Sequence, residues 1–81
     1  DHYSRLALER MADRLEGLQR RLAAQALEHG SGARAVEAWA EARGEGAERI
    51  RVAVGEIAAD PAPDIAKLSV ATGLLEDLVG M

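Results

Sequence analysis

The stretch RLEGLQRRLAAQAL, residues 14–27, decides the fold that the sequence predicts. Its leucines Leu15, Leu18 and Leu22 alternate spacings of three and four residues, which is the period of one helix face. With three arginines beside them, the pattern suits a coiled-coil seam, a basic nucleic-acid-binding helix or one wall of a helical bundle. With Leu8 and Met11 upstream, the stripe covers about two heptads before Gln25 interrupts it, which is too short for a sustained coiled coil. We therefore expect these leucines to pack against other helices of the same chain.

Helix boundaries follow from capping residues and helix breakers. The first helix is predicted from an N-cap at Ser4 to about His29, where the motif HGSG ends it with a glycine. The motif DPAPD at residues 60–64 breaks the chain again, because proline cannot occupy a helix interior. Asp64 can then cap a last helix that closes at Gly80. The predicted core stripe of this last helix is Ile65, Leu68, Thr72, Leu75 and Val79.

The middle segment leaves two alternatives open. Apolar residues keep the same alternating spacing from about 33 to 59, which favours one continuous helix. Gly44 and Gly46 weaken that helix by about 1 kcal/mol each, and a break between them would give two short helices. The predicted fold class is therefore all-α, a small antiparallel bundle of three helices, or of four if the middle helix breaks at Gly44–Gly46. Residues 1–81 form a single helical domain in this prediction, and the start at Asp1 rather than Met suggests a fragment of a larger chain.

Composition and charge exclude several classes of function. The chain has no cysteine, which rules out disulfides and thiolate metal sites. No apolar run approaches the roughly 20 residues of a membrane helix, and no signal peptide is apparent, so we expect a cytoplasmic protein without a membrane partner. The net charge is −4, and residues 1–29 balance five arginines against five carboxylates. Because nucleic-acid binding requires a basic surface, no nucleic-acid partner is expected.

Three motifs resemble chemical sites, and each has a plainer explanation. The motif GSGARA at residues 30–35 matches a relaxed dinucleotide-binding fingerprint, but a helix rather than a strand precedes it, so we expect a flexible turn. Glu28 and His29 suggest a metal site, yet His2 is the only other histidine and no paired spacing exists, so we expect a surface histidine that interacts with the dipole at a helix C-terminus. Ser69 lies in no nucleophile motif and is expected to face solvent or to bond back to its own helix. No catalytic, cofactor-binding or metal-binding residue is therefore predicted.

Trp39 is the only tryptophan and the largest apolar side chain in the sequence. It is either a binding hot spot or the cap of a small core, and the second role is the expectation. The carboxylates Glu37, Glu41 and Glu45 repeat every four residues and are expected to form an exposed acidic edge. Lys67, the sole lysine, is expected to contribute to solubility.

Several features in chain order match a known pattern. They are Asp1, Tyr3, Leu6, Ala7, Asp13, Leu15, the run LQRRLAAQAL at 18–27, Trp39, Asp64 and the run LSVA at 68–71. In this order and spacing the chain resembles the C-terminal helical region of the large bacterial NAD-specific glutamate dehydrogenases. Arg14 and Glu16 depart from that family's pattern, and so do Gly73 and Leu74, which stand where arginines usually follow LSVA.

The resemblance implies a parent chain that oxidatively deaminates L-glutamate to 2-oxoglutarate and ammonia, with NAD as the cofactor. It implies that the present residues are a structural or assembly domain, whose partners are the rest of the parent chain or neighbouring subunits. The fragment itself would bind no cofactor, and no catalytic residue can be transferred to it, because the catalytic motifs lie elsewhere in the parent. The residues alone leave a second hypothesis open, a free-standing helical protein–protein interaction module that forms a homodimer.

The charge balance gives a first prediction. Neither duplex nor single-stranded nucleic acid should bind the chain, because the first helix is balanced and residues 60–81 carry four carboxylates against one lysine. A gel-shift titration at micromolar protein and low salt checks this. A salt-sensitive shift would contradict the prediction.

Overall fold

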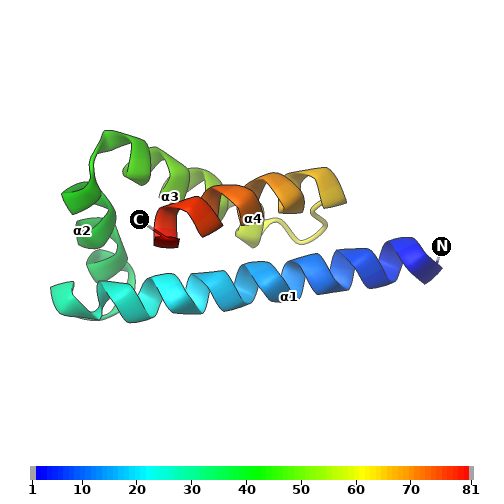
Figure 1. Ribbon diagram of the computed structural model, residues 1–81, viewed down its shortest axis with the longest axis horizontal. Coiled ribbons are helices and arrows are strands. Elements are labelled where there is room, and N and C mark those ends of the chain that lie inside the picture. Colours follow the sequence, from blue (N-terminus) through cyan, green and yellow to red (C-terminus); the bar gives the residue numbers. More distant parts are fainter. Residues whose placement is uncertain (1, 81) are drawn as a thin grey trace.

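The computed structural model describes residues 2–80, which form four α-helices and one short 3-10 helix (Figure 1). Their bounds are α1 His2–Gln25, η1 Ala26–His29, α2 Gly32–Arg43, α3 Glu45–Ala59 and α4 Ile65–Gly80. Within this range there is no strand, so the predicted all-α class is confirmed. Asp1, one of the residues that carry the family resemblance, lies outside the described range.

Helix α4 is the centre of the bundle. It packs along both α1 and α3, whereas α1 and α3 hardly contact each other. Figure 1 shows α1 and α4 running in the same direction, α3 running against them, and α2 crossing the end of the bundle. Two polar contacts fasten α4 to α1: Gln25 Nε2 donates to the Val79 carbonyl oxygen at 2.9 Å, and Arg14 Nε donates to Glu76 Oε1 at 2.6 Å. The bundle is therefore two helix pairs that share α4.

The core draws on all four α-helices. Leu15 and Leu22 of α1 are 3% and 6% exposed, and Leu18 is partly buried against the same core. The prediction that this leucine stripe faces the other helices of its own chain is thereby confirmed. The core is completed mainly by Val54 of α3, Trp39 and Ala40 of α2, and Leu68, Ala71, Leu75, Leu78 and Val79 of α4.

The prediction of a continuous middle helix is wrong, because the chain breaks at Gly44. This residue has φ 114° and ψ 173°, a conformation that other residues rarely adopt. A straight helix over residues 32–59 would be about 42 Å long, whereas the 16 residues of α4 span about 24 Å. The break turns α2 across the bundle end and lets Trp39 reach the core rather than extend past it. The four-helix alternative is the correct one.

The predicted N-cap at Ser4 is also wrong. Helix α1 already includes His2, so Ser4 lies inside its first turns. No proline stands before Ser4 to stop the helix from extending toward the N-terminus. At the other end the prediction is confirmed, because the helical conformation continues through η1 to His29, and Gly30 follows with φ 117°.

None of the helices in the described part of the chain is long and apolar enough to cross a membrane. Even α4, which has only three charged residues (Lys67, Glu76 and Asp77), is 16 residues long, below the roughly 20 that a bilayer requires. Its apolar character serves instead to contact two helices at once.

Leu75→Ala should therefore destabilise the fold severely. The leucine side chain is fully buried on the central helix, so its truncation leaves a cavity and should lower the free energy of unfolding by about 2–5 kcal/mol. For a domain with roughly 4–12 kcal/mol in total, that is a large fraction. Urea unfolding followed by circular dichroism measures the change.

Val70→Ala is the matched control on the same helix. Its side chain is 57% exposed, so the free energy of unfolding should change by no more than about 0.5 kcal/mol. Equal effects of the two substitutions would show that α4 is not the packed centre of the bundle.

Candidate functional site

The glycine-rich motif at residues 30–35 lies in the turn between η1 and α2. Gly30 and Gly32 have φ of 117° and 75°, as a tight helix–helix connection requires. A helix and not a strand precedes the motif, so no strand–turn–helix unit exists there to receive a pyrophosphate. The residues present do not fit NAD, and the interpretation of this motif as a turn is confirmed.

Glu28 and His29 lie together but find no third ligand. His29 Nε2 is 3.3 Å from Glu28 Oε1. Among residues 2–80, no three His, Cys, Asp or Glu side chains are grouped as a metal site requires. The pair is therefore a local ion pair whenever the histidine is protonated.

Ser69 and Lys67 lie on the exposed side of α4. Ser69 faces solvent, as expected. Lys67 Nζ is 4.0 Å from Asp60 Oδ2, a distance at which an exposed pair contributes little to stability.

Trp39 is a core residue, as predicted. Its side chain is 0% exposed, and the Arg43 guanidinium stacks on the ring with Cζ 3.8 Å from the ring centroid. Arg43 Nη1 also donates to the Trp39 carbonyl oxygen at 3.3 Å. The indole Nε1–H has no acceptor within the described part of the chain, which is a cost the packing must outweigh. A fully covered ring cannot serve as an exposed binding anchor.

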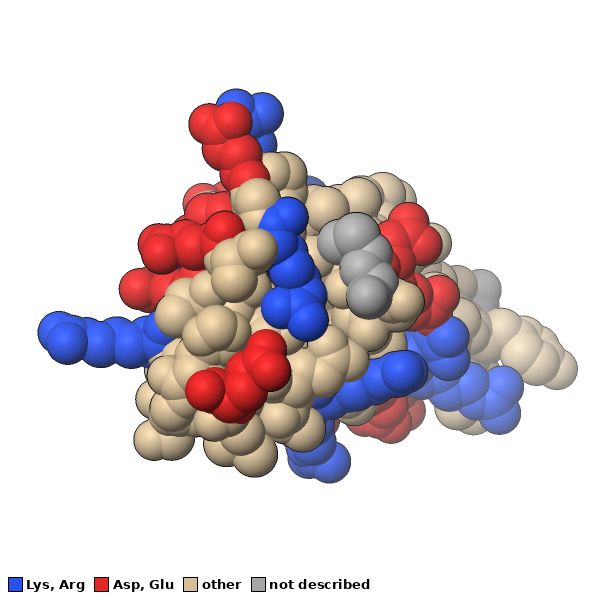
Figure 2. All heavy atoms as spheres, turned by 60° about the vertical axis from the view of Figure 1, so that its left-hand side comes forward, with Lys and Arg blue, Asp and Glu red and all other residues tan. Residues whose placement is uncertain are grey.

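Glu37, Glu41 and Glu45 are all exposed, as predicted, but the break at Gly44 leaves the first two on α2 and places Glu45 at the start of α3. The α2 carboxylates lie near one arginine of α3. Arg51 donates to both carboxylate oxygens of Glu48, at 2.9 and 2.6 Å. These bonds lower the pKa of Glu48 and raise the pKa of Arg51, and the nearby charges of Glu37 and Glu41 raise the latter further. The positive charge of the Arg51 guanidinium is thus balanced by the carboxylates around it. On the face shown in Figure 2, acidic and basic side chains are interspersed, without a large area of one sign.

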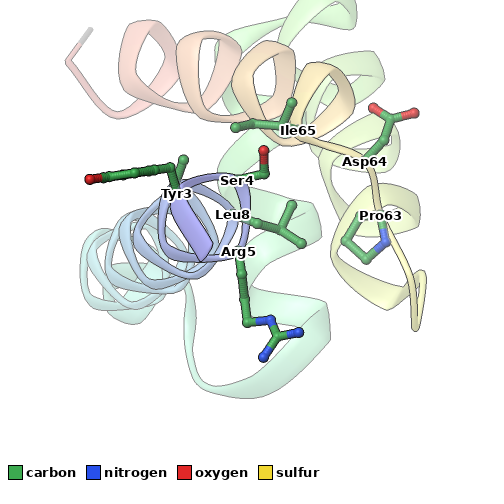
Figure 3. A pocket seen from close by; sticks show the side chains of 8 residues that line it. Tyr3, Ser4, Arg5, Leu8, Pro63, Asp64 and Ile65 are labelled. Carbon is green, nitrogen blue, oxygen red and sulfur yellow. The ribbon is translucent and has the colours of Figure 1, made fainter. Parts of the chain in front are cut away.

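A hollow of about 630 Å³ lies between the start of α1 and the start of α4 (Figure 3). Leu8 points toward Pro63 across the gap, and Ile65 closes it from α4. Arg5 and Asp64 lie at its edge and point outward, as does the ring of Tyr3. Leu8, Pro63 and Ile65 thus make part of the hollow apolar, Ser4 adds a hydroxyl, and Arg5 and Asp64 place one charge of each sign at the edge. Nothing in it resembles a catalytic constellation.

A second hollow of about 390 Å³ continues the first along α1. The two share Pro63, and the second lies between Leu15 of α1 and Ile57 of α3, with Leu68 of α4 also lining it. It exists because α1 and α3 both contact α4 but hardly contact each other. We call the two hollows together the α1 groove.

The local conformation at the α1 groove is set by Asp60 and Asp64. Asp60 Oδ1 accepts a hydrogen bond from the Ala62 N–H at 2.9 Å, and Asp64 Oδ1 accepts one from the Lys67 N–H at 2.8 Å. The first closes a turn around Pro61, and the second is the predicted N-cap of α4, which is confirmed.

The sequence did not reveal the α1 groove. The alternating stripe placed Ile65 in the core, and this is wrong, because Ile65 is 45% exposed. Tyr3, at 81% exposure, is a second large side chain left uncovered beside the groove. The available signal was an apolar residue directly after a helix cap, where the first turn protrudes beyond the packed region.

Comparison with known proteins identifies a family. A family model described as "Glutamate dehydrogenase, C-terminal" matches residues 1–77, which include all of α1, α2 and α3 and most of α4. No curated protein matches the chain, and no solved structure does.

Asp64→Ala should destabilise the start of α4, which forms one wall of the α1 groove. It removes the acceptor of the Lys67 N–H, so the free energy of unfolding should fall by about 0.5–2 kcal/mol. Asp77→Ala is the control, because Asp77 is exposed near the C-terminal end of the same helix, where a carboxylate is unfavourable. Denaturant unfolding measures the free energy of unfolding of both variants. An equal or larger decrease for Asp77→Ala would contradict the assignment of Asp64 as the N-cap.

Proposed function

Because the chain belongs to the glutamate dehydrogenase, C-terminal family, we propose that it is the helical assembly domain at the C-terminal end of an NAD-dependent glutamate dehydrogenase. The match over residues 1–77 is the observation that carries this proposal, and it agrees with the resemblance of the sequence. In the proposed parent enzyme, L-glutamate and NAD give 2-oxoglutarate, ammonia and NADH. The proposed setting is amino-acid catabolism in a bacterial cytoplasm.

The domain contributes packing surfaces rather than chemistry in this proposal. Hydride transfer requires a fold that positions the nicotinamide against the substrate, and such folds are built from strand–turn–helix units. Residues 2–80 contain helices only, and their glycine-rich turn does not fit NAD. The partners are therefore the rest of the parent chain or neighbouring subunits.

A free-standing interaction module is the competing hypothesis, and the coding sequence upstream of Asp1 separates the two. Several hundred upstream residues of an α/β enzyme would support the proposal. A start codon close to Asp1 would contradict it and would favour the interaction module.

The isolated 81-residue chain should form no NADH from L-glutamate and NAD, whereas the full parent enzyme should form it readily. Absorbance of NADH, followed at matched molar concentrations, measures both. Glutamate-dependent NADH formation by the isolated chain would overturn the assignment of an assembly domain.

A further inference from the structure

We propose that two copies of the chain assemble into a dimer by exchanging their N-terminal halves through a hinge at Gly44. In this exchanged dimer α2 and α3 join into one straight helix, and α1 and α2 of each copy pack on α3 and α4 of the other. The inference goes beyond the proposed function, because it concerns the 81-residue chain itself. One step alone rests on the proposed function: in the parent enzyme the exchange would link two neighbouring subunits.

The hinge is a single residue. Gly44 stands alone between the end of α2 at Arg43 and the start of α3 at Glu45, where Figure 1 shows a sharp bend. Its φ of 114° and ψ of 173° belong to a region essentially confined to glycine. A β-carbon added there would meet no atom within 4 Å in the described part of the chain. Backbone conformation therefore decides between the bend and a continuous helix.

The sequence on both sides of the hinge supports a straight helix. On a helix over residues 32–59, Trp39, Ile50 and Val54 lie on one side, because the apolar period continues across Gly44. All three contribute to the core of the bent chain, so a second copy would have to cover this same face. Straightening also lets the first N–H groups of α3 donate to carbonyl oxygens of α2, a bonding that the bend prevents.

The contacts between the two halves can form equally well between two copies. Gln25 donates to the Val79 carbonyl oxygen at 2.9 Å, and Arg14 pairs with Glu76. These bonds, and the packing of α1 on α4 and of α2 on α3, each join a residue before Gly44 to a residue after it. The exchanged dimer thus rebuilds the same contacts, and the main cost of forming it is the entropy of association.

Charges at the bend favour the closed monomer at low concentration. Arg43 lies in the last turn of α2, and Glu45 and Glu48 lie in the first turn of α3, where each charge is stabilised by the helix dipole. A continuous helix removes these two helix ends. We therefore expect the wild-type chain to exchange at high concentration, such as the effective concentration between domains held in one oligomer.

Gly44→Ala tests the hinge in the 81-residue chain. Alanine disfavours the bend and favours the helix, so each hinge should shift toward the straight form about tenfold or more, which corresponds to about 1.4 kcal/mol. Because a dimer contains two hinges, the dimerisation constant should rise about hundredfold or more. Sedimentation equilibrium over a concentration series measures this constant, and circular dichroism checks that the helices are retained.

Gly46→Ala is the matched control. Gly46 lies inside α3 without a positive φ, and it has the same open space for a β-carbon. The substitution strengthens α3 equally in the monomer and in the dimer, so the dimerisation constant should stay at its wild-type value. Insertion of two glycines after Arg43 in the Gly44→Ala chain is a second control. The longer connection lets the chain close again and should restore the monomer.

Cross-linking detects exchange directly with the wild-type hinge. The chain has no cysteine, so Arg14→Cys and Glu76→Cys can be made in separate chains, each with a single thiol. When the two chains are mixed and refolded together at high concentration, a short bismaleimide should join them, because exchange places the two positions side by side between copies. Val70→Cys in place of Glu76→Cys measures random collision, since Val70 is an exposed residue of α4.

Three outcomes would overturn the inference: a helical Gly44→Ala chain that stays monomeric, equal dimerisation of the Gly44→Ala and Gly46→Ala chains, or a cross-linking yield no higher than that of random collision. If Gly44→Ala loses its helices, the cross-linking yield alone tests the exchange. None of these outcomes affects the proposed function, which fails on the upstream coding sequence or on NADH formation by the isolated chain.

Discussion

The structure depends on the burial of α4 between two helices that hardly contact each other. Leu75 and Leu78 are fully covered, which requires α1 on one side of α4 and α3 on the other. With only two aromatic residues in the chain, no single large side chain can fill the space between α1 and α3, and the space remains as the α1 groove. The feature that stabilises the core and the feature that forms the surface hollow are thus consequences of the same arrangement.

The crossing of α2 accompanies a match in length between α3 and α4. Helix α3 has 15 residues and α4 has 16, so the two match without any contribution from residues 32–43. Those residues carry Trp39, whose large apolar ring is strongly stabilised by burial. Turning at Gly44 lets α2 cover the end of the bundle, and Arg43 covers the ring with its guanidinium.

The sequence predicts the conformation and burial of some residues and not of others. The cap at Asp64, the turn at Gly30 and the inward leucines of α1 follow from local rules, and all were predicted. The break at Gly44 could not be decided, because the apolar period continues across it and the deciding factor is the length of a helix elsewhere in the fold. Ile65 was misplaced for a similar reason, since periodicity gives the direction of a side chain but not whether a neighbouring helix extends far enough to cover it. The α1 groove depends on the separation of α1 and α3, on which a single-sequence pattern carries no information.

The pairing of the first helix with the last also determines how the domain can fold. Arg14 and Glu76, which join α1 to α4, are 62 residues apart in the sequence. Small helical domains usually fold fast because their contacts are local. In this domain α1 and α4 lie at opposite ends of the sequence, so bringing them into contact requires the closure of a long loop, which costs entropy. The hairpin of α3 and α4 can form early, but it leaves one side of α4 uncovered until α1 docks. Folding of this domain should therefore be slower than is usual for a helical bundle of its size, with an aggregation-prone apolar helix exposed in the interval.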